Sequence, residues 1–192
     1  MAHRIPKLSL GALHWVFWSA FGVFFMFIVA YLEQAGFTPV QIGLIMGSAS
    51  TANLLGQLVW GVVSDRYDIV HKLVPGLLVV ATAVGLLYLV VPHTLAALLV
   101  MTTVLSLFAQ AAPPILDGWT MRFAAHSERI TYGPLRAMGA VGFSITVAVL
   151  GNVFDRYGLQ LMFPVFVGCM AMAAAVSVWA NQQYRVLRRE VA

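Results

Sequence analysis

Long apolar runs separated by short polar connections dominate this sequence of 192 residues. A membrane-spanning helix needs about 20 mainly apolar residues to cross the hydrocarbon core of a bilayer, and six runs reach that length. They occupy residues 8–32, 39–63, 73–91, 95–117, 134–154 and 159–180. The connections between them are too short to fold as soluble domains. The pattern therefore predicts an all-α membrane protein in which residues 1–192 form a single domain of six transmembrane helices.

Two local signals refine these spans. Thr38, Pro39 and Gln41 have the spacing of a capping box, in which the cap residue and the third helical residue bond each other's backbone N–H groups. Because proline is favoured at the first helical position, a helix is expected to begin at Pro39. The adjacent Pro113 and Pro114 remove two backbone donors from the fourth span. A kink or a break is therefore expected near them.

Composition supports the same class of protein and excludes others. The chain is 61% hydrophobic and 9% charged, whereas an average soluble domain is about 45–50% apolar and about 25% charged. Its net charge of +4 does not indicate nucleic-acid binding, because the basic residues stand at segment ends instead of forming one patch. A single cysteine, Cys169, excludes an internal disulfide, and no catalytic, phosphate-binding or metal-binding motif is present. We expect no enzymatic activity, cofactor or metal.

The basic residues predict the orientation in the membrane. Ten of the eleven Lys and Arg residues lie at the N-terminus, in the second and fourth connections or in the tail, and Arg156 is the exception. An even number of spans places both termini on one side. Because cytoplasmic segments carry an excess of Lys and Arg, both termini are expected in the cytoplasm.

A charged segment between the second and third spans contains Gly61, Asp65, Arg66 and Lys72. Charges packed between two spans are typical of a tight cytoplasmic loop. The spacing Gly-x-x-x-Asp-Arg, followed by basic residues, resembles the signature of the major facilitator superfamily of transporters. Asp68 stands where that family usually has a second glycine. The resemblance implies a conformational latch, in which the aspartate engages the other half of a transporter.

The same pattern recurs ninety residues later, at Gly151, Asp155 and Arg156. Each copy ends the second helix of a set of three, so the two copies should face opposite sides of the membrane. This layout indicates two inverted three-helix repeats, which build each six-helix half of major facilitator transporters. The simpler alternative is that this pattern suits the end of any apolar helix.

Residues 132–143 and 31–44 narrow the resemblance to one branch of the superfamily. They look like the fifth helix and the first two helices of the lactose permease and phenylpropionate permease-like transporters. In the sugar-transporting relatives, an arginine of the fifth helix and an acid at the end of the fourth hold the substrate. The resemblance implies that role for Arg136 and Asp117. It also places Phe143 where those relatives stack an aromatic ring on the sugar.

The residues themselves allow two interpretations of this pair. A charge at the middle of a membrane helix costs about 2.5–3.5 kcal/mol on insertion scales, so Asp117 and Arg136 should pair or lie near water. A pair offers both donors and an acceptor to a polar or anionic solute. Alternatively, both lie at the cytoplasmic interface, where Arg136 only helps orientation and Asp117 caps a broken helix.

Three further polar residues are candidates for contact with a solute or a proton. Asn53 and Gln57 lie four residues apart and therefore share a helix face. Amides at membrane depth should face the bundle or a watery cavity, so both are predicted solute contacts. His14 is a candidate proton carrier, although a lone histidine is more often hydrogen-bonded inside the bundle.

The function expected from this resemblance is transport of a small organic solute, with protons as a candidate coupling ion, by alternating access in a bacterial plasma membrane. The chain stops where the central loop of a twelve-helix transporter should begin. A second six-helix half is therefore expected, in another chain or in a homodimer. Asp65 should bind either this half or, within the chain, Arg66, Lys72 or a base of the fourth connection. The alternative is a non-transporting membrane scaffold, a partner subunit or a truncated remnant of a transporter.

Overall fold

The structure is a computed structural model, and it describes the backbone of residues 4–125 and 131–191. Within these ranges the chain is all helical, with eight α-helices, one π-helical turn and one 3-10 turn. The α-helices are α1 (Arg4–Phe25), α2 (Ile28–Gln34), α3 (Pro39–Tyr67), α4 (Val70–Val90), α5 (Leu95–Leu105), α6 (Ala112–Ala125), α7 (Tyr132–Tyr157) and α8 (Met162–Val191). The π turn is η1 (Ser106–Gln110), and the 3-10 turn is η2 (Leu159–Leu161).

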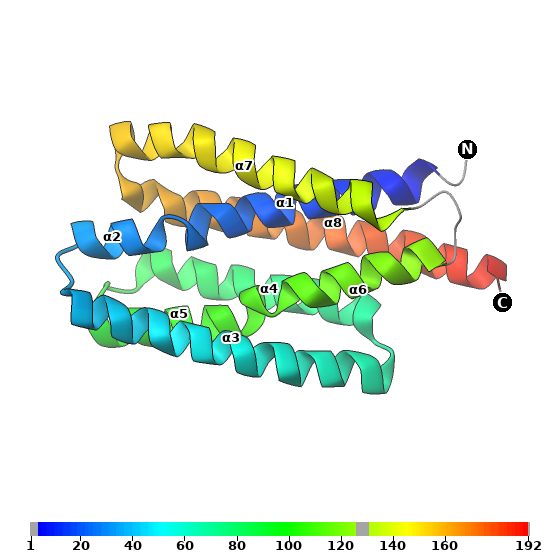
Figure 1. The fold of residues 1–192 in the computed structure, drawn as a ribbon, viewed down its shortest axis with the longest axis horizontal. Coiled ribbons are helices and arrows are strands. Elements are labelled where there is room, and N and C mark those ends of the chain that lie inside the picture. Colours follow the sequence, from blue (N-terminus) through cyan, green and yellow to red (C-terminus); the bar gives the residue numbers. More distant parts are fainter. Residues whose placement is uncertain (1–3, 126–130, 192) are drawn as a thin grey trace.

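Six segments of the described chain are long and apolar enough to cross a membrane. The first consists of α1 and α2, which are separated by a turn at Met26 and Phe27 that the hydropathy pattern did not indicate. The fourth consists of α5, η1 and α6. The six segments run roughly parallel to one axis, and both termini lie at the same end of the bundle (Figure 1). An all-α membrane fold of six spans is thus confirmed.

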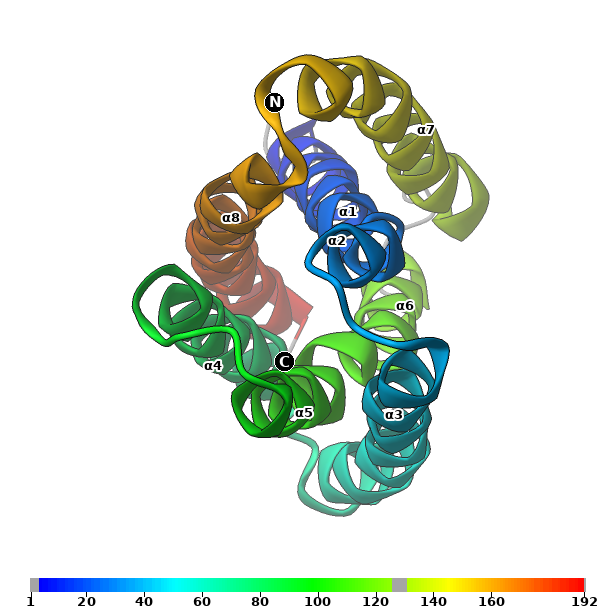
Figure 2. The ribbon, with the colours of Figure 1, turned by 90° about the vertical axis from the view of Figure 1, so that its left-hand side faces the viewer.

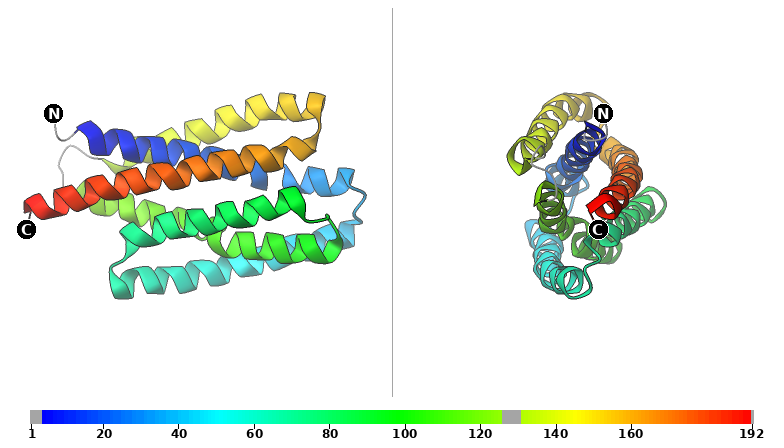
Figure 3. Two further views of the ribbon diagram at one scale, coloured as in Figure 1. Left: turned by 180° about the vertical axis from the view of Figure 1, so that it is seen from behind. Right: turned by 90° about the vertical axis from the view of Figure 1, so that its right-hand side faces the viewer.

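Helix α1 packs between α7 and α8 (Figure 2). Its buried rings, Phe17 and Phe24, belong to the hydrophobic core. Helix α8 also packs along α4 on the far side of the molecule (Figure 3). By contrast, only 22% of the apolar window of α3 and 17% of that of α7 are buried. These two helices therefore present broad apolar faces to their surroundings.

The two prolines of the fourth span lie in the first turn of α6, where backbone N–H groups have no helical partner. The expected break is confirmed, and it falls just before them, in η1. Trp60 of α3 donates a hydrogen bond from its indole Nε1 to the Leu107 carbonyl in this π turn, at 3.0 Å. The break thus receives support from α3, which a sequence pattern cannot show.

The two copies of the Gly-x-x-x-Asp-Arg pattern end α3 and α7. Tyr67 is the last residue of α3 and Tyr157 the last of α7, and each is followed by a residue of positive φ: Asp68 at 49° and Gly158 at 97°. Aspartate tolerates this left-handed conformation better than most residues do, which explains how it can replace a glycine. The two helix ends lie at opposite ends of the bundle, as inverted repeats require (Figure 1).

Candidate functional site

Asp117 and Arg136 form an ion pair between the fourth and fifth spans. Asp117 lies on α6 and Arg136 on the first turns of α7, and Nε of the arginine is 3.7 Å from Oδ1 of the aspartate. Their side chains are 27% and 32% exposed, so the pair is half-buried. The Tyr132 side chain is a hydrogen-bond partner of Asp117. Each charge thus has a partner, as the cost of burying it requires.

The aromatic ring at this pair is Trp18 of α1. The Cζ atom of Arg136 lies 4.0 Å from the centroid of the indole, a close cation–π contact. Gly139, one turn further along α7, makes room for the ring, because a methyl group there would lie 2.4 Å from Cδ1 of Trp18. Three spans therefore meet at Arg136.

Sequence reasoning had singled out Phe143 for the aromatic role and had missed Trp18. The ring of Phe143 lies against Gly22 of α1, where a methyl group would come within 3.0 Å of Cδ2. Its contact with a solute stays a prediction. Trp18 is one of many aromatic residues in the first span, and no feature of its sequence neighbourhood distinguishes it.

His14 lies one turn before Trp18 on α1 and is completely buried. Its Nε2 atom is 2.9 Å from Oγ1 of Thr120 on α6, and the Thr120 hydroxyl donates to the carbonyl of Leu116 at 2.9 Å. Arg136 lies close enough to interact electrostatically with the imidazole. The expectation of a hydrogen bond inside the bundle is therefore met, and His14 is part of the same neighbourhood as the ion pair.

The two amides predicted as solute contacts bond to each other. Nε2 of Gln57 donates to Oδ1 of Asn53 at 2.9 Å, so they share a face of α3 as their spacing indicated. Gln57 also lines a cavity of about 230 Å³ between α3, α4 and α6, together with Asp65 and Arg122. The structure thus groups Gln57 with the charged end of α3 and not with the ion pair. A solute contact at either amide stays a prediction.

The charged segment after the second span is helical, which corrects its assignment to a loop. Gly61, Asp65 and Arg66 lie in the last turns of α3, and Lys72 lies in the first turn of α4. The connection between the helices consists of residues 68–69 only. Hydropathy locates the apolar part of a span, but backbone hydrogen bonding carries a helix on through polar residues, so α3 extends beyond residue 63.

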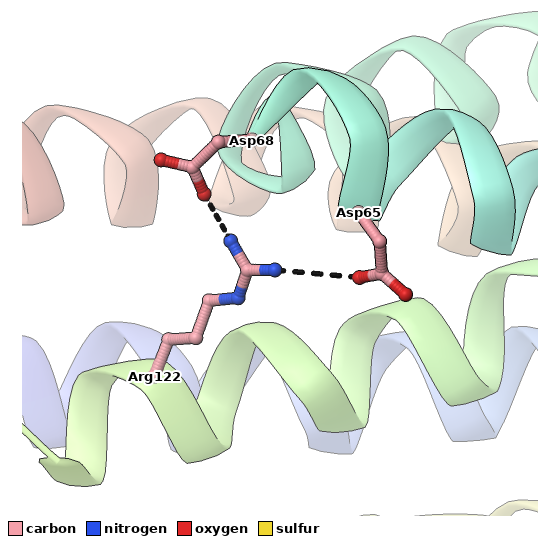
Figure 4. Close-up of polar contacts among 3 residues, drawn as sticks. All are labelled: Asp65, Asp68 and Arg122. Atoms are coloured by element: carbon pink, nitrogen blue, oxygen red, sulfur yellow. Dashed lines mark hydrogen bonds and ion pairs between the residues drawn. The ribbon is translucent and has the colours of Figure 1, made fainter.

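Arg122 near the end of α6 lies between two carboxylates of this segment (Figure 4). Its Nη2 atom is 3.4 Å from Oδ1 of Asp65, and its Nη1 atom donates to Oδ1 of Asp68. We call these three residues the Arg122 clamp. Asp65 thus pairs with Arg122, one of its expected partners, which the charge pattern had assigned to the fourth connection and which lies on α6. The clamp joins the second span to the fourth at the end of the bundle that carries the termini (Figures 1 and 4).

The second copy of the pattern lies in a different environment. A methyl group added at Gly151 would lie 3.7 Å from Cζ of Phe27 in the first span, and Asp155 and Arg156 are exposed in the last turn of α7. Among the described residues, no salt bridge joins either of them to another side chain. The described residues also contain no group of three or more His, Cys, Asp or Glu side chains that could hold a metal ion.

A family model described as the MFS_1 like family matches residues 7–189, almost the whole chain. The chain belongs to the MFS_1 like family. This membership confirms the resemblance to major facilitator transporters, whose general activity is membrane transport.

Two relatives match the chain at the same sequence identity. The chain is 28% identical over 159 residues to the maltose permease of Geobacillus stearothermophilus. This match covers 82% of the chain and 40% of the permease. It is also 28% identical over 163 residues to the probable 3-phenylpropionic acid transporter of Escherichia coli K12. This match covers 81% of the chain and 40% of the transporter. The chain therefore matches less than half the length of these relatives.

Proposed function

We propose that this chain forms one half of a membrane transporter that moves a small organic solute by alternating access, and that Asp117 and Arg136 hold the solute. The observation that carries the proposal is the half-buried ion pair between two membrane spans, with Trp18 stacked on the guanidinium. Such a pair presents a fork of donors, an acceptor and an apolar ring at one place. These are the groups that bind a small solute with both polar and apolar surfaces.

The names of the two relatives suggest two solutes as probes. One is maltose, a neutral sugar, and the other is 3-phenylpropionate, an aromatic monocarboxylate. Either could bind the guanidinium of Arg136, and the ring of Trp18 suits a sugar face or a phenyl ring. We propose proton symport as the mode of coupling, with His14, which interacts electrostatically with Arg136, as the proton carrier.

The partner is a second six-helix half, in another chain or as a second copy of this chain. The weakly buried faces of α3 and α7 support this proposal, because they carry large exposed apolar side chains. They include Leu44, Leu54, Leu55, Leu58 and Val62 on α3 and Met138, Val141, Ile145 and Val149 on α7. The Arg122 clamp would latch this half in one conformation. We place the protein in a bacterial plasma membrane with both termini in the cytoplasm, because basic residues lie at the end of the bundle that carries the termini.

Substitution of the ion pair tests this function. Arg136→Lys keeps the charge but loses the planar fork, so binding of maltose or 3-phenylpropionate to the chain in lipid nanodiscs should fall about tenfold or more. Arg185→Lys, at an exposed position of α8, is the matched control and should bind as the unchanged chain does. Equal binding by Arg136→Lys and the unchanged chain would contradict the proposed site. Uptake by neither the chain alone nor the chain with a six-helix partner would favour a non-transporting scaffold.

A further inference from the structure

The hydrogen bonds around His14 favour a proton on Nε2 over a proton on Nδ1. The Thr120 hydroxyl has one hydrogen, and it donates this hydrogen to the Leu116 carbonyl. The bond between the same hydroxyl oxygen and Nε2 of His14 then requires the imidazole to donate. In a neutral ring, the proton on Nε2 leaves a lone pair on Nδ1, so Nδ1 is a hydrogen-bond acceptor.

This acceptor is buried and has no hydrogen-bond partner among the described residues. Two other buried polar atoms near Arg136 share that property: the indole Nε1 of Trp18 and Oδ1 of Asp117, whose ion-pair contact with Nε of Arg136 at 3.7 Å is longer than a hydrogen bond. His14 and Trp18 lie four residues apart, so both belong to one face of α1. Native proteins satisfy most of their buried polar atoms. Three such atoms around one arginine therefore form a place where a bound solute would find hydrogen-bond partners.

The three atoms also define the chemistry of that molecule. Nδ1 of His14 and Oδ1 of Asp117 can accept hydrogen bonds from donors, whereas Nε1 of Trp18 needs an acceptor and the guanidinium of Arg136 has several N–H groups to donate. A monocarboxylate at neutral pH only accepts hydrogen bonds, so it would leave the two acceptors unsatisfied. A hydroxyl group both donates and accepts, and it can satisfy both kinds of atom.

We propose that His14 is a solute-binding residue of this site, and that its Nδ1 atom accepts a hydrogen bond from a hydroxyl or amino group of the solute. The inference rests on the proposed function, because it deepens the description of the site formed by Asp117 and Arg136. The competing explanation is that His14 only joins α1 to α6 through Thr120.

Two substitutions separate these roles, because each keeps one of the two ring nitrogens. The amide nitrogen of His14→Gln can reach the place of Nε2 and keep the bond to Thr120, but this variant has no acceptor at the place of Nδ1. The amide oxygen of His14→Asn lies near the place of Nδ1, but the shorter side chain loses Thr120. His93→Gln is the matched control, since His93 bonds to Tyr31 and to the Tyr88 carbonyl at the other end of the bundle.

The experiment measures binding of maltose and of 3-phenylpropionate to the chain and its variants in nanodiscs. We expect the unchanged chain to bind maltose and His14→Gln to bind it about tenfold more weakly. The maltose affinities of His14→Asn and His93→Gln should stay within about threefold of that of the unchanged chain. Binding of maltose by His14→Gln at the unchanged level would overturn the inference, as would a greater loss in His14→Asn than in His14→Gln. A chain that binds only 3-phenylpropionate, with loss in Arg136→Lys, would overturn the inference and leave the proposed function standing. Binding of neither probe would overturn both.

A second measurement uses the unchanged chain, so it does not depend on whether a variant folds. In nanodiscs of the chain labelled with ¹⁵N-histidine, addition of maltose should shift the Nδ1 resonance of His14 towards that of a hydrogen-bonded nitrogen. The resonances of His93 should stay in place. A maltose-saturated chain with an unmoved His14 resonance would overturn the inference.

Discussion

Arg136 of α7 and Trp18 of α1 are stacked, with the guanidinium carbon 4.0 Å from the centroid of the indole ring. The same guanidinium faces Asp117 of α6. The position of the arginine is therefore set by two helices besides its own. A solute that binds Arg136 would contact groups from three of the six spans, so it would report on how these spans are arranged.

Removal of the indole should weaken solute binding. A cation–π contact contributes about 0.5–2 kcal/mol, depending on how far it is desolvated, so Trp18→Leu should weaken binding of the proposed solute about 2- to 30-fold. The affinity of Trp18→Phe for the solute should lie between that of Trp18→Leu and that of the unchanged chain, because a phenyl face attracts a cation less strongly than an indole face. Calorimetric titration of each variant with maltose measures the effect.

Phe143→Leu provides the comparison, because both rings are candidates for the aromatic role. The ring of Phe143 lies against Gly22, whereas that of Trp18 lies on the guanidinium. We therefore expect Phe143→Leu to lose less affinity for the solute than Trp18→Leu does. A larger loss in Phe143→Leu would show that the structure-based choice of ring is wrong.

The Arg122 clamp should restrain the connection between α3 and α4 without contributing much stability. Its carboxylates are 82% exposed at Asp65 and 55% exposed at Asp68, and exposed ion pairs contribute about 0–1 kcal/mol. Arg122→Gln removes both pairs. Backbone hydrogen exchange over residues 64–72 should become faster in this variant, while the unfolding temperature changes little. Salt at about 0.5 M should have a similar effect on the unchanged chain, since it screens exposed charges.

Arg156→Gln is the matched control for the clamp. Arg156 is exposed in the last turn of α7, where it corresponds to Arg66 of the first repeat, and the described structure shows no ion pair for it. Hydrogen exchange near the end of α7 should be unchanged in this variant. If Arg122→Gln also left residues 64–72 unchanged, the clamp would not restrain this connection.

Local features were predictable where a few neighbouring residues determine them. The capping box at Thr38 forms as expected, with the Gln41 side chain accepting from the Thr38 N–H at 2.9 Å and the Thr38 hydroxyl accepting from the Gln41 N–H at 3.3 Å. The break before Pro113 followed from the missing backbone donors. The pairing of Asp117 with Arg136 followed both from the family resemblance and from the cost of isolated charges in a membrane.

Features that depend on the rotation of one helix against another were not predictable. Trp18 faces Arg136 because α1 and α7 approach closely at Gly139, and no periodicity in the first span distinguishes this ring from its aromatic neighbours. The partner of Asp65 among several candidate bases depends on where α6 ends relative to α3. Such contacts arise from tertiary packing, which a single sequence does not encode in a readable pattern.

The support that α3 gives to the π turn of the fourth span leads to a prediction on stability. A methyl group at Gly56 would lie 2.5 Å from the Leu107 carbonyl oxygen, which also accepts the indole hydrogen bond of Trp60. Backbone cannot move aside as a flexible side chain can, so Gly56→Ala should force α3 away from η1. Overpacking of this kind costs about 1–3 kcal/mol. The thermal unfolding temperature in detergent, followed by circular dichroism, should therefore fall.

Gly47→Ala on the same helix separates this packing effect from helix propensity. A methyl group at Gly47 would meet no atom within 4 Å, and alanine stabilises a helix interior by about 0.5–1 kcal/mol relative to glycine. Gly47→Ala should thus unfold at the same or a higher temperature, although the chemical change is identical. Equal effects at the two positions would mean that the close approach of α3 to the π turn contributes nothing to stability. A loss at Gly56 alone would show that this contact holds the broken fourth span, and with it the helix that carries Asp117.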